Sequence, residues 1–272
     1  MPFFPNTNDE VSQFLRDRSK SLLHISGGEK DRPICETISL SKLNRVLLYE
    51  PEEMMVSVQS GIALFELQKI LSGKGQWIPT LVHSETLEKT LGAAVATDHF
   101  HGRTLNCGAL RTTILGGTFC TTSGEIFKSG SRVVKSVAGY DIHRAFCGSR
   151  GLFGIILDLT LKVQPLPEMF YRFFAPPEAR EEILEFHPTC LEEHVGKLLV
   201  EFGGYREDIQ FDVRQLRSSN LRIEELDEGQ WAEAVRKLIA VRDKEKEKAL
   251  SVVTEELLKK IRRVFDPEGV LI

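Results

Sequence analysis

Hydrophobic and polar positions in the first part of the chain alternate between short strand-like runs and single helices. Short apolar runs bounded by turn-forming residues predict strands at residues 21–25, 45–50 and 54–59. Residues 63–71 carry apolar side chains at helical spacing and are followed by Gly73, which predicts a helix that ends there. The apolar face of this helix is expected to consist of Leu64, Leu67, Ile70 and Leu71. Short strands that alternate with single helices indicate an α+β fold with two small sheets.

The pattern changes after Pro167. Residues 169–230 are more polar and carry strand-like pieces, which indicates a second, smaller module. From residue 231 onward apolar side chains recur at helical spacing. One face of this helical segment consists of Trp231, Val235, Leu238 and Ile239. We therefore expect a first domain at residues 1–168 (subdomains at about 1–58 and 59–168), a second module at 169–230, and C-terminal helices at 231–272 that return to the first domain.

Composition and charge exclude several classes of protein. The chain is 42% hydrophobic and 27% charged with a net charge of −4, and no basic patch predicts binding to nucleic acid. No apolar run approaches the roughly 20 residues that span a bilayer, and the first residues lack the pattern of a secretory signal. The five cysteines are scattered without CxxC spacing, which is typical of free thiols in a reducing cytosol.

The segment from Val133 to Pro167 carries the clearest functional signal. Gly148, Gly151 and Gly154 come directly before the apolar run 155–163, which predicts a strand. Glycines in this position let the backbone approach a flat or anionic ligand closely, because no Cβ stands in the way. The segment therefore predicts one wall of a pocket for a large cofactor.

Two further segments could line a phosphate. Ser26, Gly27 and Gly28 follow a predicted strand and could form a phosphate-holding loop, although the same residues also form ordinary turns. Gly92 and its small neighbours could lie beside a pyrophosphate or could simply pack tightly. The dinucleotide fingerprint GxGxxG and the Walker A motif are both absent, which excludes a nicotinamide-binding Rossmann domain on this pattern.

The polar clusters of the chain do not identify a catalytic residue. His99 and His101 have the spacing of a metal pair, but no third ligand can be assigned, so we expect no metal. Tyr140 and Asp141 could be an acid–base pair, or a packed tyrosine and a turn-capping aspartate. No nucleophile motif such as GxSxG is present.

The order of these segments resembles the FAD-linked oxidases of the vanillyl-alcohol-oxidase type, which have a PCMH-type FAD-binding domain. Within that family it is most similar to the FAD-binding subunits of bacterial glycolate oxidases. The resemblance covers residues 20–168 and returns at 259–269. Its most specific parts are VAGYD at 137–141 and GSRGLFGI at 148–155.

The resemblance implies a two-subdomain PCMH-type fold that holds FAD between the subdomains, with a reduced cap region and a C-terminal helical segment. The resemblance implies that the pyrophosphate is bound by Ile25, Ser26, Gly27, Gly28, Glu29 and Lys30. It implies that the residues beside the diphosphate and the flavin are Thr90, Leu91, Gly92 and Ala93. It implies that the ribityl chain and the adenine are held by Ala138, Gly139, Tyr140, Asp141, Gly148, Ser149, Gly151, Gly154, Ile155 and Ile156. The family's catalytic residues have no match here, because His187 and His194 stand alone in the shortened cap region.

In function, the resemblance implies an FAD-binding subunit of a glycolate or related 2-hydroxy-acid dehydrogenase complex. Its partners would be a catalytic flavoprotein subunit and an iron–sulfur subunit, in the cytoplasm or at the membrane through those partners. One alternative is a stand-alone FAD-dependent 2-hydroxy-acid oxidoreductase. Another is a non-catalytic assembly subunit with a vestigial flavin site, which is suggested by Ser26 and Glu29 in the first loop where the family has glycines.

Overall fold

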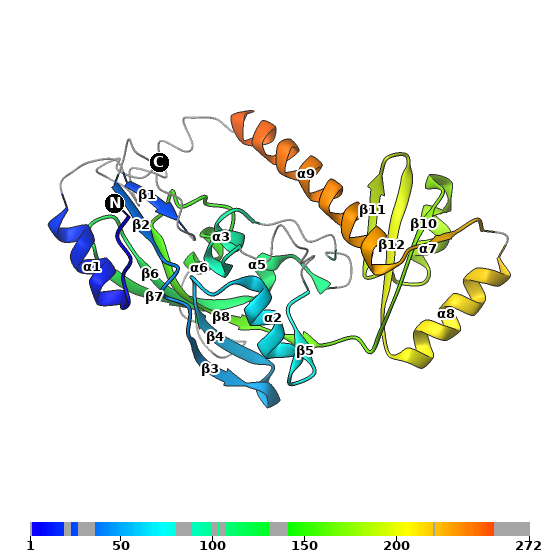
Figure 1. Cartoon of the computed structure of the whole chain (residues 1–272), viewed down its shortest axis with the longest axis horizontal. Helices are drawn as coiled ribbons and strands as arrows, with labels where there is room; N and C mark the ends of the chain where they lie inside the picture. The colour runs from blue at the N-terminus through cyan, green and yellow to red at the C-terminus, as the bar shows by residue number, and fades with distance from the viewer. Residues whose placement is uncertain are drawn as a thin grey trace.

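In the computed structural model, the described residues are 2–18, 23–26, 36–79, 89–98, 103, 107–130, 141–219 and 221–252. They form two modules that lie side by side, followed by one long helix (Figure 1). The N-terminal module extends to residue 165 and the second module covers residues 169–226. Mixed helices and antiparallel sheets confirm the α+β class that the sequence predicts.

A five-stranded antiparallel sheet is the centre of the N-terminal module, with the strand order β3-β4-β8-β6-β7. Its strands are β3 (Val46–Glu50), β4 (Met55–Gln59), β6 (Ile114–Cys120), β7 (Ile126–Gly130) and β8 (Ile155–Lys162). The first two are joined by the 3-10 turn η1 (Pro51–Glu53), as the Pro-Glu-Glu sequence favours. A two-stranded pair of β5 (Gln76–Trp77) and β9 (Gln164–Pro165) lies beside this sheet.

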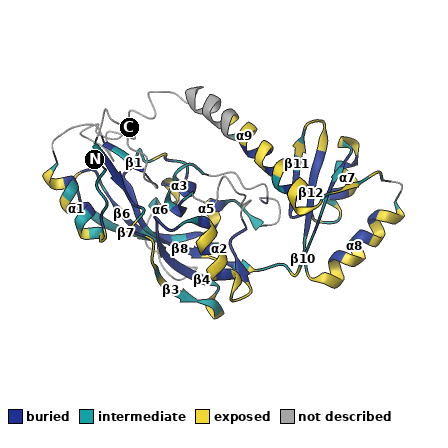
Figure 2. Ribbon diagram, viewed as in Figure 1, coloured by how far each residue is buried: buried dark blue, intermediate teal, exposed yellow. Residues whose placement is uncertain are grey.

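Each face of this sheet is covered by a different layer (Figure 2). One face packs against α2 (Leu64–Ser72) and α3 (Leu91–Ala96), near the short helices α5 (Leu110–Thr113) and α6 (Ile142–Ala145). The other face packs against α1 (Asn8–Asp17) and the parallel pair β1 (Leu23–Ser26) and β2 (Glu36–Ser39). Helix α1 begins where Thr7 Oγ1 accepts a hydrogen bond from the Glu10 N–H at 3.1 Å.

Helix α2 confirms the predicted helix but not its whole apolar face. Leu64, Leu67 and Leu71 are buried, whereas Ile70 is 42% exposed. Successive residues of a helix are separated by about 100° around its axis, so Ile70 lies away from Leu71 toward solvent. The apolar surface of α2 is therefore narrower than predicted.

The second module is a four-stranded antiparallel sheet with helices on one face. Its strands, in the order β11-β12-β10-β13, are β11 (Cys190–His194), β12 (Lys197–Gly204), β10 (Met169–Ala175) and β13 (Glu224–Glu225). Helix α7 (Arg180–Leu184), which follows the 3-10 turn η2 (Pro177–Ala179), and helix α8 (Arg206–Ser218) share one core with Leu198, Val200 and Phe202 of β12. Alternate residues of β12 therefore face the helices, and Leu199 faces the opposite side.

Helix α9 (Glu228–Val252) covers that opposite side. The predicted face of Trp231, Val235, Leu238 and Ile239 is buried against Cys190 and Leu199 of the second module. This face of α9 therefore packs on the second module, and the return of residues 231–272 to the first domain stays a prediction. Residues 253–272 lie outside the described residues. No helix in the described part of the chain has both the length and the apolar character to cross a membrane.

A buried carboxylate joins the two modules. Arg103 of the N-terminal module donates to Glu201 of β12 through Nε (2.7 Å) and a terminal nitrogen (2.8 Å), and Arg172 of β10 donates to the same carboxylate at 2.9 Å. Glu201 is fully buried, and Thr189 Oγ1 donates to it at 3.1 Å. Burial alone would raise the pKa of Glu201, but the attraction and hydrogen bonds of the two arginines outweigh burial and lower its pKa.

Aromatic rings lie against both guanidinium groups. Arg103 lies 4.9 Å from the ring of Trp77 and 5.6 Å from that of Phe170, and Arg172 lies 5.0 Å from the rings of both Phe170 and Trp231. These contacts extend from β5 through β10 to α9, so they connect all three parts of the described chain. Cation–π contacts of desolvated arginines stabilise such an arrangement by about 1–2 kcal/mol each.

We expect the replacement Glu201→Gln to lower the free energy of unfolding by about 3–5 kcal/mol, because it leaves two buried guanidinium groups without their shared carboxylate. Urea denaturation of the full chain measures this change. The matched control is Glu224→Gln, whose pair with Lys197 is about half exposed and should contribute less than about 1 kcal/mol. Equal stability of the Glu201→Gln variant and the parent would contradict the proposed role of this carboxylate.

The same carboxylate predicts a pH dependence. Because the pKa of Glu201 is lowered in the folded state from its ordinary value of 4.5, its contribution to stability is complete above that value and is lost as the pH falls through the lowered pKa. Denaturation at a series of acidic pH values should show a steeper loss of stability for the parent than for Glu201→Gln. Parallel curves would show that this group does not contribute.

Candidate functional site

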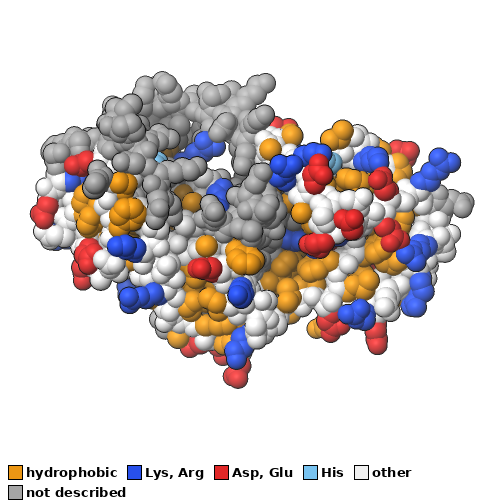
Figure 3. Space-filling model, viewed as in Figure 1, with side chains coloured by type: hydrophobic (Ala, Val, Ile, Leu, Met, Phe, Trp, Pro, Cys, Tyr) orange, Lys and Arg blue, Asp and Glu red, His pale blue; other side chains and the backbone are white. Residues whose placement is uncertain are grey.

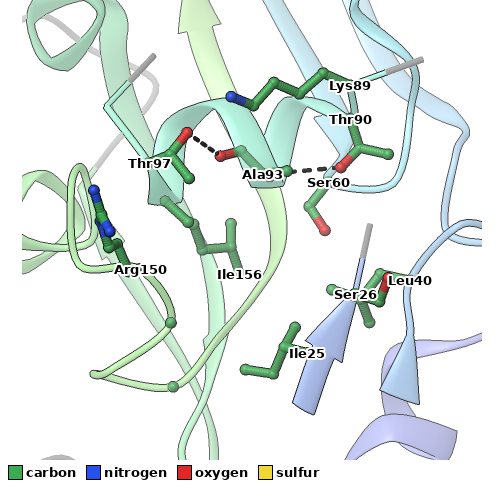
Figure 4. Close-up of a pocket in the computed structure, with 14 residues that line it drawn as sticks. Ile25, Ser26, Leu40, Ser60, Lys89, Thr90, Ala93, Thr97, Arg150 and Ile156 are labelled. Carbon is green, nitrogen blue, oxygen red and sulfur yellow. Dashed lines mark hydrogen bonds between the residues drawn. The ribbon is translucent and has the colours of Figure 1, made fainter. Parts of the chain in front are cut away.

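A cavity of about 320 Å³ lies where β1, α3 and the loop before β8 meet (Figure 4). This volume is within the range of small-molecule pockets. The cavity is lined by Ile25, Ser26, Leu40, Ser60, Lys89, Thr90, Gly92, Ala93, Ala96, Thr97, Arg150, Gly151, Gly154 and Ile156. These residues come from five separate segments, which the folding of the N-terminal module brings together.

The cavity contains part of each of the three segments that the sequence singles out. The predicted residues that line it are Ile25, Ser26, Thr90, Gly92, Ala93, Gly151, Gly154 and Ile156. Seven further predicted residues lie outside the described residues, and these are Gly27, Gly28, Glu29, Lys30, Ala138, Gly139 and Tyr140. Their role therefore stays a prediction.

Five predicted residues are described but do not line the cavity. Leu91 is fully buried among the helices of the N-terminal module, and Ile155 packs on the opposite face of β8 from Ile156. Asp141 precedes α6, is exposed, and pairs with Arg144 at 3.4 Å. Gly148 and Ser149 lie in the turn before the cavity wall.

The close approach of Gly92 to Ser60 fixes one wall of the cavity. The Gly92 N–H donates to the Ser60 carbonyl oxygen at 2.7 Å. A Cβ on Gly92 would lie only 2.9 Å from the Cβ of Ser60, so no larger residue fits without displacing the strand end. The start of α3 is thereby held against the end of β4.

The backbone N–H groups at the start of α3 already have hydrogen-bond acceptors within the protein. The N–H groups of Leu91, Gly92 and Ala93 donate to the Ile62 carbonyl, the Ser60 carbonyl and Thr90 Oγ1. A diphosphate beside this segment would therefore meet side chains and small residues rather than unpaired amides.

Side chains supply hydroxyl and positively charged groups around the cavity. Figure 4 shows the side chains of Lys89 and Arg150 at different sides of the cavity. Among the described residues that line the cavity, none is acidic. Both observations favour an anionic ligand.

Ser60 contributes a hydroxyl group that the described structure leaves unsatisfied. Its Oγ is buried without a hydrogen-bond partner, and the residue is 1% exposed. A buried hydroxyl without a partner costs about 1–3 kcal/mol, so such a group at a cavity wall favours a ligand that can bond to it.

Sequence reasoning missed six of the lining residues, which are Leu40, Ser60, Lys89, Ala96, Thr97 and Arg150. Lys89 and Arg150 directly adjoin predicted residues, so a positive charge beside each small-residue segment was an available signal. Leu40 and Ser60 gave no local signal, because they reach the cavity only through the pairing of distant strands.

The nearby thiol and acid groups do not form a nucleophilic site. Cys147 Sγ donates to Asp98 Oδ1 at 3.4 Å, and burial together with the Asp98 carboxylate raises the pKa of this thiol to about 12. A protonated thiol is a poor nucleophile. Among the described residues no cluster of His, Cys, Asp and Glu could hold a metal, and His99 and His101 lie outside them.

Comparison with known proteins identifies the fold that carries this cavity. Residues 3–130 match the family described as FAD binding domain. Together with the relatives described below, this match supports a place for the chain among the FAD-linked oxidases. Its resemblance to this family, stated above on VAGYD and GSRGLFGI, is therefore confirmed.

Curated relatives are similar over most of this chain but are longer. D-lactate dehydrogenase of Anaerostipes hadrus is 31% identical over 192 residues, which are 70% of this chain and 39% of that protein. Glycolate oxidase subunit GlcE of Escherichia coli (strain K12) is 28% identical over 184 residues, which are 65% of this chain and 53% of that protein. The chain spans about half the length of these relatives or less.

Solved structures show the same fold. Two structures of alkyldihydroxyacetonephosphate synthase superpose with TM-scores of 0.71 and 0.67 at 17% and 18% identity. They cover 99% and 89% of this chain, which in turn covers 75% and 55% of them. This similarity establishes a common fold for both modules, and it confirms the predicted FAD-binding fold.

The residues of the cavity fit FAD. Its diphosphate is an anion, and Lys89, Arg150 and the unsatisfied Ser60 hydroxyl are groups that bind anionic oxygens. Gly92, Ala93 and Gly151 leave space along the walls for an extended ligand. The described part of the FAD-binding domain thus provides charge, hydroxyl groups and space for part of the cofactor.

We expect Ser60→Ala to weaken FAD binding by about three- to tenfold, because it removes one hydrogen bond to the ligand. The same change should raise the free energy of unfolding of the cofactor-free chain by about 1 kcal/mol, because an unsatisfied buried hydroxyl is lost. Flavin titration and urea denaturation measure the two effects.

Thr122→Val is the matched control for this variant. Thr122 Oγ1 is also buried without a partner but does not line the cavity, so the control should leave FAD affinity unchanged. Unchanged FAD affinity of Ser60→Ala would exclude Ser60 as a ligand-binding residue.

Proposed function

We propose that this chain is the FAD-binding subunit of a glycolate or related 2-hydroxy-acid dehydrogenase complex. The observation that carries the proposal is the cavity with Lys89, Arg150 and Ser60 in a domain that matches the FAD-binding family. Two relatives are named glycolate oxidase subunits, GlcE of Escherichia coli (strain K12) and GlcD of Bacillus subtilis (strain 168). Their names support assembly with other subunits.

In this proposal the chain binds and orients FAD. The bound flavin supplies the capacity to accept and pass on electrons. Lys89 and Arg150 balance the diphosphate charge, Ser60 and Thr90 offer hydroxyl groups, and Gly151 lets the ligand lie against the backbone. The predicted loop Ser26–Lys30 and segment Ala138–Asp141 would complete the binding site.

The second module supports a subunit rather than a complete enzyme. It contains two histidines, of which His194 stacks on Phe174 and His187 lies in the turn after α7. Neither lines the FAD cavity. We therefore propose that oxidation of the hydroxy acid takes place on a partner, a catalytic flavoprotein subunit, with an iron–sulfur subunit receiving electrons in the cytoplasm.

We expect the purified full chain to bind one equivalent of FAD in an absorbance titration and to show no turnover of glycolate or D-lactate with an artificial electron acceptor. Turnover by the isolated chain would favour the stand-alone oxidoreductase instead. A folded chain that takes up no FAD would contradict the proposal and favour the assembly subunit with a vestigial site.

Purification of the tagged chain from its own cells under mild conditions tests the complex. The proposal expects a co-purifying flavoprotein and the absorbance of an iron–sulfur cluster. Recovery of the chain as an FAD-bound protein without either partner would contradict the subunit assignment while leaving FAD binding intact.

A further inference from the structure

A second and larger cavity, of about 480 Å³, lies between the two modules. It is bounded by α2 and β5 of the N-terminal module, by β10 of the second module, and by the first turns of α9. Figure 3 shows hydrophobic side chains gathered in a hollow at this junction. Among the described residues, the linings of this cavity and the FAD cavity share no residue.

Aromatic rings form the walls of this interdomain cavity. Phe65, Trp77, Phe170 and Trp231 all line it. Trp77 and Trp231 are the two tryptophans of the chain and are almost fully buried, whereas Phe65 is 49% exposed at the rim. A pocket with such walls favours a ligand with a flat or apolar body.

One donor at this cavity lacks an acceptor. The indole nitrogen of Trp77 is buried without a hydrogen-bond partner. A buried indole N–H normally has a hydrogen-bond partner. The missing partner of the Trp77 N–H in a residue that lines the cavity therefore favours a ligand that carries an acceptor oxygen.

The charges at the cavity favour a ligand that carries a carboxylate. Arg172 lines the cavity and is bonded on one side to buried Glu201 and on the other to Glu228. The Glu228 side chain is 83% exposed and belongs to the first residue of α9. A ligand carboxylate can therefore replace Glu228 on Arg172 without removing the buried carboxylate that joins the modules.

We propose that the interdomain cavity binds an organic carboxylate with an aromatic or similarly flat apolar body. The carboxylate bonds to Arg172 in place of Glu228, and the body lies among Phe65, Trp77, Phe170 and Trp231. No residue of this cavity lines the FAD cavity, so the proposal does not depend on the proposed function.

Titration of the full chain with phenylacetate, followed by tryptophan fluorescence, tests the proposal because both tryptophans line the cavity. We expect a saturable change with phenylacetate, and binding about tenfold weaker for the neutral phenylacetamide and for glycolate. Absence of a saturable change with phenylacetate would overturn the site. Equal affinity for phenylacetamide or for glycolate would overturn the carboxylate or the apolar part of the assignment.

Two pairs of variants test the carboxylate contact and the apolar contact separately. Glu228→Gln removes the competing carboxylate and should tighten phenylacetate binding several-fold, while the control Glu207→Gln, an exposed acid in the first turn of α8, should not. Phe65→Ala should weaken binding several-fold, while Ile70→Ala on the exposed side of the same helix should not. If either variant behaves like its control, the corresponding contact is wrong. FAD uptake, read from flavin absorbance, should be unchanged in all four variants.

Discussion

The contact between Gly92 and Ser60 determines what the FAD cavity can offer a ligand. It holds the start of α3 against the end of β4 through a hydrogen bond of 2.7 Å and leaves no space for a Cβ on residue 92. The N–H groups at the start of α3 are all hydrogen-bonded within the protein. The Ser60 hydroxyl remains buried at the wall without a hydrogen-bond partner. We therefore propose that the described surface binds an anion through side chains such as Lys89 and Arg150.

A second constraint places the two modules relative to each other. Glu201 binds Arg103 of one module and Arg172 of the other, and the rings of Trp77, Phe170 and Trp231, which lie against these arginines, extend this junction. The interdomain cavity exists only because the modules dock in this way. The fold thus separates a cavity made within the N-terminal module from one made between modules, and binding at each can be measured independently.

Local sequence patterns predicted the elements and the glycine-lined wall, but not the contacts between distant segments. Gly151 and Gly154 come directly before a strand, so their position at the cavity follows from neighbouring residues. Ile155 and Ile156 were both assigned to the site, and only the pairing of β8 shows that they face opposite sides. Arg103 and Glu201 are 98 residues apart, and no periodicity indicates their bond. The same limit applies to α9, because helical spacing does not reveal which sheet a helix covers.

A crystal structure of the full chain grown with FAD would test the central claim most directly. We expect the diphosphate in the cavity between β1 and α3, with an oxygen within hydrogen-bond distance of Ser60 Oγ and positive charge from Lys89 or Arg150 close to it. FAD bound elsewhere on the chain, or bound in this cavity with Ser60 Oγ still unpartnered, would contradict this assignment.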